Sequence, residues 1–250
     1  MLGGHPRALS TLFFTEMWER FTFYGMRALL VLFLVDAVDS GGYGFDDKTA
    51  TAIYGLYTAA VFMAALPGGW IADRLIGAQR AVMIGGTLMT LGTLMLTIPG
   101  PKQLFFGGLV VIILGVGLLK PNVSTLVADL YPEGGGRRDA GFTIFYMGIN
   151  LGAFIGPLIA GWLAQRYGWR IGFLAAAIGM PLGLLQFWLA RGRLGGAGER
   201  PNRQDGGAGL RHDWTALGIA VAVLALLALL VFSGTIQVSP APLAKSAAYV

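Results

Sequence analysis

The stretch TEMWERFTFYGMR, residues 15–27, places two glutamates and two arginines inside an otherwise apolar segment. On a helix each residue advances about 100°, so the polar side chains of this stretch fall within an arc of roughly 140°. These side chains are Glu16, Glu19, Arg20, Tyr24 and Arg27. The stretch therefore predicts a helix with one polar stripe, whose other faces suit lipid or neighbouring helices.

The four charges of this stretch are costly in a membrane. A charge near the bilayer centre costs about 2.5 to 3.5 kcal/mol, so four unpaired charges cost about 10 to 14 kcal/mol. The Leu, Phe and Val side chains of residues 9–35 return only about 4 to 8 kcal/mol. The segment needs internal partners or a water-filled cavity, and Glu16 with Arg20, four residues apart, supplies one ion pair. The alternative is a buried salt bridge that only fixes helix packing, although such pairs seldom stabilise a protein relative to apolar packing.

Composition indicates an integral membrane protein. Of the 250 residues, 55% are hydrophobic and only 12% are charged, whereas soluble domains have about 25% charged residues. Seven apolar stretches are long enough to cross a bilayer, which takes about 17 to 25 residues. They are residues 9–35, 50–72, 80–98, 103–130, 141–164, 170–190 and 214–233.

The basic residues predict the orientation. With a cytoplasmic amino end, the inside segments hold ten Arg and the outside segments only five Lys and Arg, in agreement with the positive-inside rule. This asymmetry accounts for the net charge of +5, so the expected surroundings are a lipid bilayer and no nucleic-acid partner is expected. The chain has no cysteine, and His5 and His212 lie outside the apolar stretches, so we expect no metal site and no cofactor.

An internal repeat links two parts of the chain. Residues 69–74 (GWIADR) align with residues 161–166 (GWLAQR) at an offset of 92 residues, which spans three predicted membrane crossings. Three is odd, so the second copy emerges on the opposite side, as in the inverted repeats of many secondary transporters. The alternative is chance, because Gly, Trp and Arg favour helix ends in membranes.

The first copy lies in the sequence GGWIADRLIGAQR, residues 68–80. It resembles the cytoplasmic loop signature of the major facilitator superfamily, in which the acidic residue pairs with basic groups and helix ends to latch one state of a rocking bundle. The resemblance makes Asp73 and Arg74 candidates for a gating loop. A solvated turn whose arginines only follow the orientation rule is the alternative, and the loop alone does not decide between them.

Two further polar side chains lie within apolar spans. Lys120 is followed by Pro121, which removes a helical hydrogen bond and predicts a kink. A lysine at this depth favours a site over a simple packing kink. Asn150 lies among Gly148, Gly152 and Gly156, whose spacing indicates close helix packing. Asn150 is either a ligand contact or a hydrogen-bonding link between helices.

Together these side chains suggest a polar cavity. Arg20, Arg27 and Lys120 provide cations that suit a carboxylate or phosphate, and Tyr24 and Asn150 provide neutral donors. Burial raises the pKa of a glutamate and a neighbouring arginine lowers it, so a glutamate under both influences can gain and lose a proton. Such a group can couple a proton gradient to a conformational change.

Three motifs resemble the proton-dependent oligopeptide transporter family, a major facilitator family. EMWERFTFYGMR is similar to its Glu-x-x-Glu-Arg-Phe-x-x-Tyr-Gly signature, and GLLKPNVSTLVADLY and FYMGINLGAFIGPLIAGW are similar to its second signature region. The similarity runs from about residue 8 to residue 190. It implies proton-coupled symport of di- and tripeptides across the cell inner membrane into the cytoplasm, and no enzymatic activity.

The resemblance also assigns roles to residues. It implies that Glu16 and Glu19 act in proton coupling, with Arg20 as their salt-bridge partner. Arg20 and Lys120 would hold the peptide carboxylate. Tyr24 and Arg27 would line that pocket, and Asn150 would contact the peptide backbone or amino end.

The expected fold is an all-α integral membrane protein, with the six-helix N-terminal bundle of a major facilitator (3+3 inverted repeat) plus one extra transmembrane helix. We expect a bundle over residues 1–190 and a cytoplasmic linker over 191–212. Residues 213–250 would form the extra helix and the start of an outer loop. A C-terminal six-helix half, with acidic groups that face Lys120, is the expected missing partner.

One position departs from the family pattern. Many members carry a tyrosine eleven residues before the loop aspartate, whereas this chain has Phe62 there, which cannot donate that hydrogen bond. Tyr54 and Tyr57 are near in the sequence but are predicted on other helix faces. Either the peptide contacts are rearranged or the preference differs.

One other transport function fits the sequence, and two other classes of membrane protein do not. A major facilitator for another small solute, such as nitrate, a drug or an amino-acid-like anion, remains the alternative. A light-driven retinal pump needs a lysine in its last span, and residues 214–233 contain none. An intramembrane enzyme is not indicated, because no His-Glu-x-x-His motif is present and no Gly-x-Ser-x-Gly elbow accompanies a usable histidine.

Overall fold

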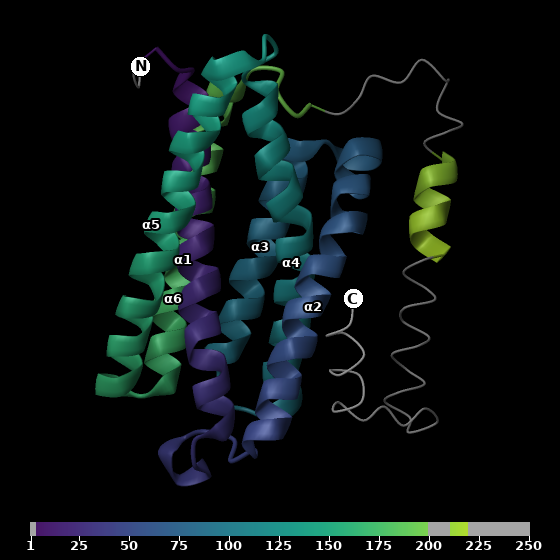
Figure 1. The fold of residues 1–250 in the computed structure, drawn as a ribbon. Helices are drawn as coiled ribbons and strands as arrows, with labels where there is room; N and C mark the ends of the chain where they lie inside the picture. Colours follow the sequence, from purple (N-terminus) through teal and green to yellow (C-terminus); the bar gives the residue numbers. More distant parts are fainter. Residues whose placement is uncertain (1–3, 200–210, 220–250) are drawn as a thin grey trace.

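The computed structural model describes residues 4–199 and 211–219, and the regular elements within these ranges are helices (Figure 1). Three single-turn helices join or follow the long ones: η1 (Val38–Ser40), η2 (Ala72–Ile76) and η3 (Arg191–Leu194). The six long helices are α1 (Arg7–Val35), α2 (Asp47–Ile71), α3 (Ala78–Thr97), α4 (Lys102–Asp129), α5 (Gly135–Tyr167) and α6 (Trp169–Ala190).

The long helices coincide with the first six predicted spans. Five helical stretches, which contain α2 to α6, are long and apolar enough to cross a membrane. Helix α1 is outside this group because Glu16, Glu19, Arg20 and Arg27 make its middle too polar. The predicted seventh span, residues 214–233, lies mostly outside the described residues.

The packing follows two groups of three helices. Helix α1 packs mainly against α5 and α6, whereas α4 packs mainly against α3 and α2. Figure 1 shows α1, α5 and α6 together on one side and α2, α3 and α4 on the other. The first helix of each predicted repeat thus packs on the second and third helices of the other repeat, as expected for a 3+3 inverted arrangement.

Glycines allow α5 to approach α1 closely. A Cβ atom at Gly148 would lie 2.8 Å from the carbonyl oxygen of Phe13. A Cβ atom at Gly152 or Gly156 would collide with the carbonyl of the facing α1 residue, Met17 or Phe21. The predicted small-residue packing is therefore confirmed for these three glycines. Gly161, five residues after Gly156 on the same helix, faces open space and takes no part in this contact.

This contact predicts a stability effect. Gly152→Val should lower the melting temperature by several degrees, because overpacking costs about 1 to 3 kcal/mol and nothing at this contact can yield except the two backbones. Gly161→Val is the matched control, since a side chain there meets nothing within 4 Å. Thermal unfolding in detergent measures both variants. Equal melting temperatures would show that the α1–α5 approach is not tight.

Helix α4 continues through Pro121 without a break. The side-chain amide of Asn122 donates to the carbonyl of Leu118 at 2.6 Å and to the carbonyl of Gly68 on α2 at 3.3 Å. The side-chain amide that follows the proline therefore bonds one carbonyl of its own helix and links α4 to α2.

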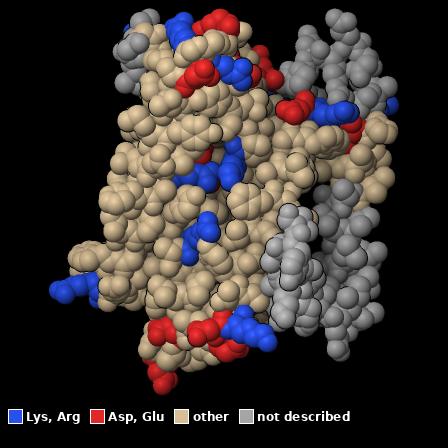
Figure 2. Space-filling model, in the orientation of Figure 1, with Lys and Arg blue, Asp and Glu red and all other residues tan. Residues whose placement is uncertain are grey.

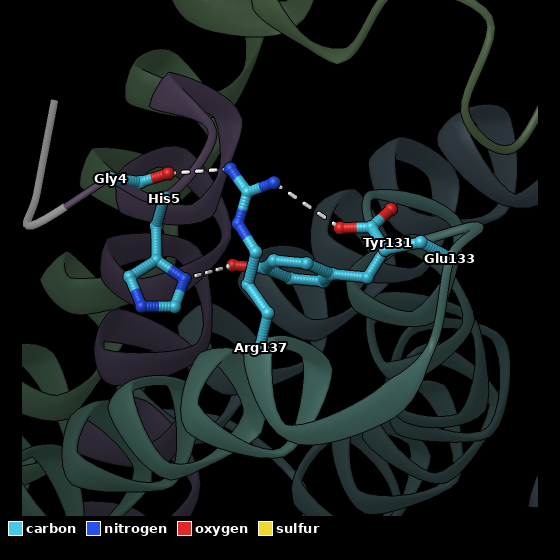
Figure 3. Close-up of polar contacts among 5 residues, drawn as sticks. All are labelled: Gly4, His5, Tyr131, Glu133 and Arg137. Atoms are coloured by element: carbon cyan, nitrogen blue, oxygen red, sulfur yellow. Dashed lines mark hydrogen bonds and ion pairs between the residues drawn. The ribbon is translucent and has the colours of Figure 1, made fainter.

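The segment before α1 is tied to the connection between α4 and α5 (Figure 3). The hydroxyl of buried Tyr131 and Nδ1 of His5 share a hydrogen bond of 2.7 Å. Arg137 donates to the carbonyl of Gly4 at 2.5 Å and pairs with Glu133 at 3.3 Å. These contacts hold the amino end of the bundle to the ends of α4 and α5.

Candidate functional site

Helix α1 brings three charged side chains together. Arg20 Nε lies 2.8 Å from Glu16 Oε1 and 2.7 Å from Glu19 Oε2. The exposed fractions of Glu16, Glu19 and Arg20 are 3%, 0% and 4%. The predicted pair of Glu16 with Arg20 is present, and Glu19 completes a buried triad with two acids and one base. Removing Arg20 would leave both buried carboxylates without their ion-pair partner.

Arg27 lies nearly two helical turns after Arg20 on α1, and two tyrosines contact it. Its Nε donates a hydrogen bond to the hydroxyl of Tyr54 on α2. Its guanidinium carbon lies 5.1 Å from the ring centroid of Tyr54 and 5.8 Å from that of Tyr24. The aromatic rings fix the direction of this cation.

Lys120 on α4 belongs to the same electrostatic group. It interacts with Glu16 and Glu19 and with Arg20 and Arg27 of α1. Its Nζ lies 4.6 Å from the ring centroid of Phe62 on α2, and the side chain is half-buried. The charges of α1 and α4 therefore face a common space. In Figure 2, the middle of the visible face is almost free of charge except for a small central group of acidic and basic side chains.

Asn150 is not brought to this group. Gly148 and Gly152 face α1, and Asn150, about 200° further round α5 than Gly148, lies on the side turned away from α1. The asparagine is exposed. Its contact with a peptide stays a prediction.

Asp73 and Arg74 lie at the end of α2, in the π-helical turn η2. Both side chains are exposed. Arg74 Nη1 lies 3.5 Å from Asp213 Oδ1, which follows the predicted linker. Gly77, with a φ of 82°, ends this turn in a conformation that favours glycine. A gating role for the turn stays a prediction.

Two tyrosines of α2 contact α1 at the site, although the sequence did not identify them as site residues. They were predicted on other helix faces than Phe62, and in the structure Tyr54 bonds Arg27 and Tyr57 stacks on Phe23 of α1. The available signal was the spacing of Tyr54, Tyr57 and Val61, which marks one face of α2. That spacing indicates a shared face but does not identify the helix that it meets.

An apolar cavity is separate from this ionic group. It has a volume of about 350 Å³ and lies between α1, α5 and α6. The α1 residues that line it are Met17, Trp18 and Phe21, and none of the four ionisable side chains of residues 15–27 lines it. Because its lining is almost entirely apolar, this cavity offers no partner to a charged solute. The candidate site is therefore the ionic group.

Comparisons with known proteins agree with the fold. Residues 79–200 match the model of the POT family. Peptide transporter YePEPT of Yersinia enterocolitica is 42% identical over 99% of this chain and 50% of its own length. The di-/tripeptide transporter of Lactococcus lactis is 43% identical over 95% of this chain and 48% of its own length.

A solved structure agrees as well. The crystal structure of peptide transporter POT in complex with sulfate has a TM-score of 0.86 and 45% identity, over 95% of this chain and 49% of that one. This chain thus spans about half the length of these relatives. From the shared sequence and the shared helical fold together, we conclude that the chain belongs to the POT family.

Proposed function

We propose that this chain is the N-terminal part of a symporter that carries di- and tripeptides with protons across the cell inner membrane. The observation that carries the proposal is the buried triad of Glu16, Glu19 and Arg20, which faces Lys120 across the space between α1 and α4. Relatives named di-/tripeptide transporters support the substrate class.

The triad suits proton coupling. While both glutamates are charged, Arg20 is held by two carboxylates at 2.7 and 2.8 Å. When Glu19 takes up a proton, it loses its charge, and Arg20 becomes available to a new anion. A peptide carboxylate is such an anion, and an arginine can bind it through two parallel hydrogen bonds. Protonation and peptide binding would then favour the same state of the carrier.

The cations would hold one end of the peptide. Lys120 is half-buried and has no acidic side chain within ion-pair distance in the described residues. Together with Arg20 it would bind the carboxylate, while Tyr24 and Arg27 would line the same pocket. The relative crystallised with sulfate shows that a related carrier accepts an anion. Acidic groups of the C-terminal half, and Asn150, would bind the amino end.

Topology completes the proposal. The distribution of basic residues over the connections supports a cytoplasmic amino end, and residues 191–212 would form a cytoplasmic linker before an inserted helix. We infer that Asp73 and Arg74 act as a gate at this side, in line with their exposure at the end of α2. The ion pair of Arg74 with Asp213 would connect that gate to the inserted helix.

A direct test distinguishes this function from its alternative, a carrier for another small anion such as nitrate. The full-length carrier is reconstituted in liposomes with a proton gradient directed inwards. We expect it to accumulate dialanine severalfold over the external concentration and not to accumulate nitrate. The 250-residue chain alone is the control, and we expect no accumulation because it lacks the partner half. Accumulation of nitrate without dialanine would favour the alternative.

A further inference from the structure

A buried hydroxyl on α2 has no partner. The exposed fraction of Tyr57 is 4%, and among the described residues its hydroxyl oxygen makes no hydrogen bond. An unpaired buried polar group is costly, and most buried polar groups in native proteins have a partner. The surroundings of Tyr57 should therefore contain an acceptor that this hydroxyl reaches.

The ring of Tyr57 packs against α1. It stacks on Phe23 with ring centroids 6.4 Å apart. Arg20 contacts the same Phe23 ring, with its guanidinium carbon 5.8 Å from the ring centroid. Three polar groups interact electrostatically with the Tyr57 hydroxyl, namely Glu19, Arg27 and Tyr54. Two of them come from α1 and one from α2.

Glu19 has the most acceptor capacity to spare among these three groups. Arg27 is a donor, and the hydroxyl of Tyr54 already uses one of its two lone pairs to accept from Arg27. Glu19 is fully buried, and within residues 4–199 and 211–219 neither of its oxygens makes a well-aligned hydrogen bond. Its Oε2 has only the ionic contact with Arg20 at 2.7 Å. An orphan donor and an orphan acceptor thus lie in one buried region.

We propose that Tyr57 is a positioning residue for proton uptake at Glu19. Its hydroxyl donates a hydrogen bond to the charged Glu19 carboxylate, directly or through one water molecule. When Glu19 is protonated it becomes a donor, and the tyrosine hydroxyl rotates to accept from it. The pair is therefore satisfied in both protonation states. This assignment rests on the proposed role of Glu19 in coupling.

The remaining charged groups around the pair stay in place in the tests. Glu19 faces Glu16 and Arg20 on its own helix and Lys120 on α4. The Tyr57 side also has Arg27 and Tyr54. Tyr57→Phe removes the hydroxyl alone and keeps the stacking on Phe23.

The first test uses uptake by the full-length carrier. In Tyr57→Phe, the pH of half-maximal proton-driven dialanine uptake should move about 0.5 to 1 unit toward alkaline pH, because the charged carboxylate loses a donor. The KM for dialanine should change less than about twofold, since the proposal assigns the hydroxyl to Glu19 and gives it no contact with the peptide. The control is Tyr167→Phe, which removes an exposed hydroxyl at the end of α5 and should leave the pH midpoint in place. An unchanged midpoint in Tyr57→Phe would overturn the proposal.

A second readout does not depend on transport. The carboxyl band of Glu19, identified by its loss in Glu19→Gln, is titrated by infrared difference spectroscopy in the purified carrier. Tyr57→Phe should move the midpoint of this band in the same direction as the uptake profile. An unmoved band with normal wild-type dialanine uptake would reject the Tyr57 role and leave the proposed function standing. A moved band in a carrier without dialanine uptake would support the contact and reject the function.

A second variant keeps the proposal testable if Tyr57→Phe does not fold. Incorporation of 3-fluorotyrosine at position 57 keeps the shape of the ring and makes the hydroxyl a stronger donor. The Glu19 band should then move in the opposite direction, toward acidic pH. A shift in the same direction as that of the phenylalanine variant, or no shift, would contradict a donated hydrogen bond.

Discussion

Glu19→Gln in the full-length carrier should abolish proton-driven accumulation of dialanine and leave exchange of dialanine between the two sides of the membrane largely intact. The side chain of Glu19 is fully buried and its Oε2 lies 2.7 Å from Arg20 Nε. Glutamine keeps the shape but neither gains nor loses a proton. The peptide site would therefore still cycle, without being driven by the gradient. Accumulation under an imposed pH gradient and counterflow without one measure the two activities separately.

We expect the accumulation ratio of Glu19→Gln to fall to about one, which is simple equilibration. Glu133→Gln is the control, because Glu133 is an exposed glutamate that pairs with Arg137 at the end of the bundle. Exposed pairs of this kind contribute little, so this variant should accumulate dialanine like the wild type. Wild-type accumulation by Glu19→Gln would show that the proton is carried elsewhere.

Lys120→Ala should raise the KM for dialanine by roughly 10- to 100-fold. A hydrogen bond to a charged group contributes about 1.5 to 3 kcal/mol, and 1.4 kcal/mol corresponds to a factor of ten in affinity. Lys120 is half-buried and shares the space of the α1 charges, so its charge is screened less than that of a surface lysine. Initial rates of uptake over a range of dialanine concentrations measure the change.

The chain offers a matched control for Lys120 on the same helix. Lys102 begins α4, where its Nζ lies 4.4 and 5.0 Å from the ring centroids of Phe45 and Tyr43. Lys102→Ala should leave the KM unchanged. The amide of dialanine, which lacks the carboxylate, tests the contact itself. If Lys120→Ala weakens the amide as much as dialanine, the lysine does not bind the carboxylate.

The helices could be predicted closely because membrane spans are long and their hydropathy is a strong signal. Helix α5 shows where this signal ends: it begins at Gly135, six residues before the predicted residue 141. Its first turns contain Arg137, Arg138 and Asp139, which are polar and favour water. A helix can extend beyond the apolar layer, and hydropathy does not detect that extension.

The site was predictable where its residues share one helix. The spacing of Glu16, Glu19 and Arg20 gave the ionic face of α1, and the structure confirms the ion pair between Glu16 and Arg20. Contacts between helices were not predictable in the same way. The bond between Arg27 and Tyr54 joins α1 to α2, and the register of one helix against another depends on packing that a single sequence does not encode locally.

The polarity of α1 has a consequence for how the protein is made. During synthesis at the ribosome, α1 emerges first, yet its charges disfavour release from the translocon into lipid. The helices that cover most of it, α5 and α6, emerge more than a hundred residues later. Stable integration of the first segment would then have to wait for the last two. In a chain whose synthesis is stalled before α5, α1 should stay accessible to a water-soluble labelling reagent.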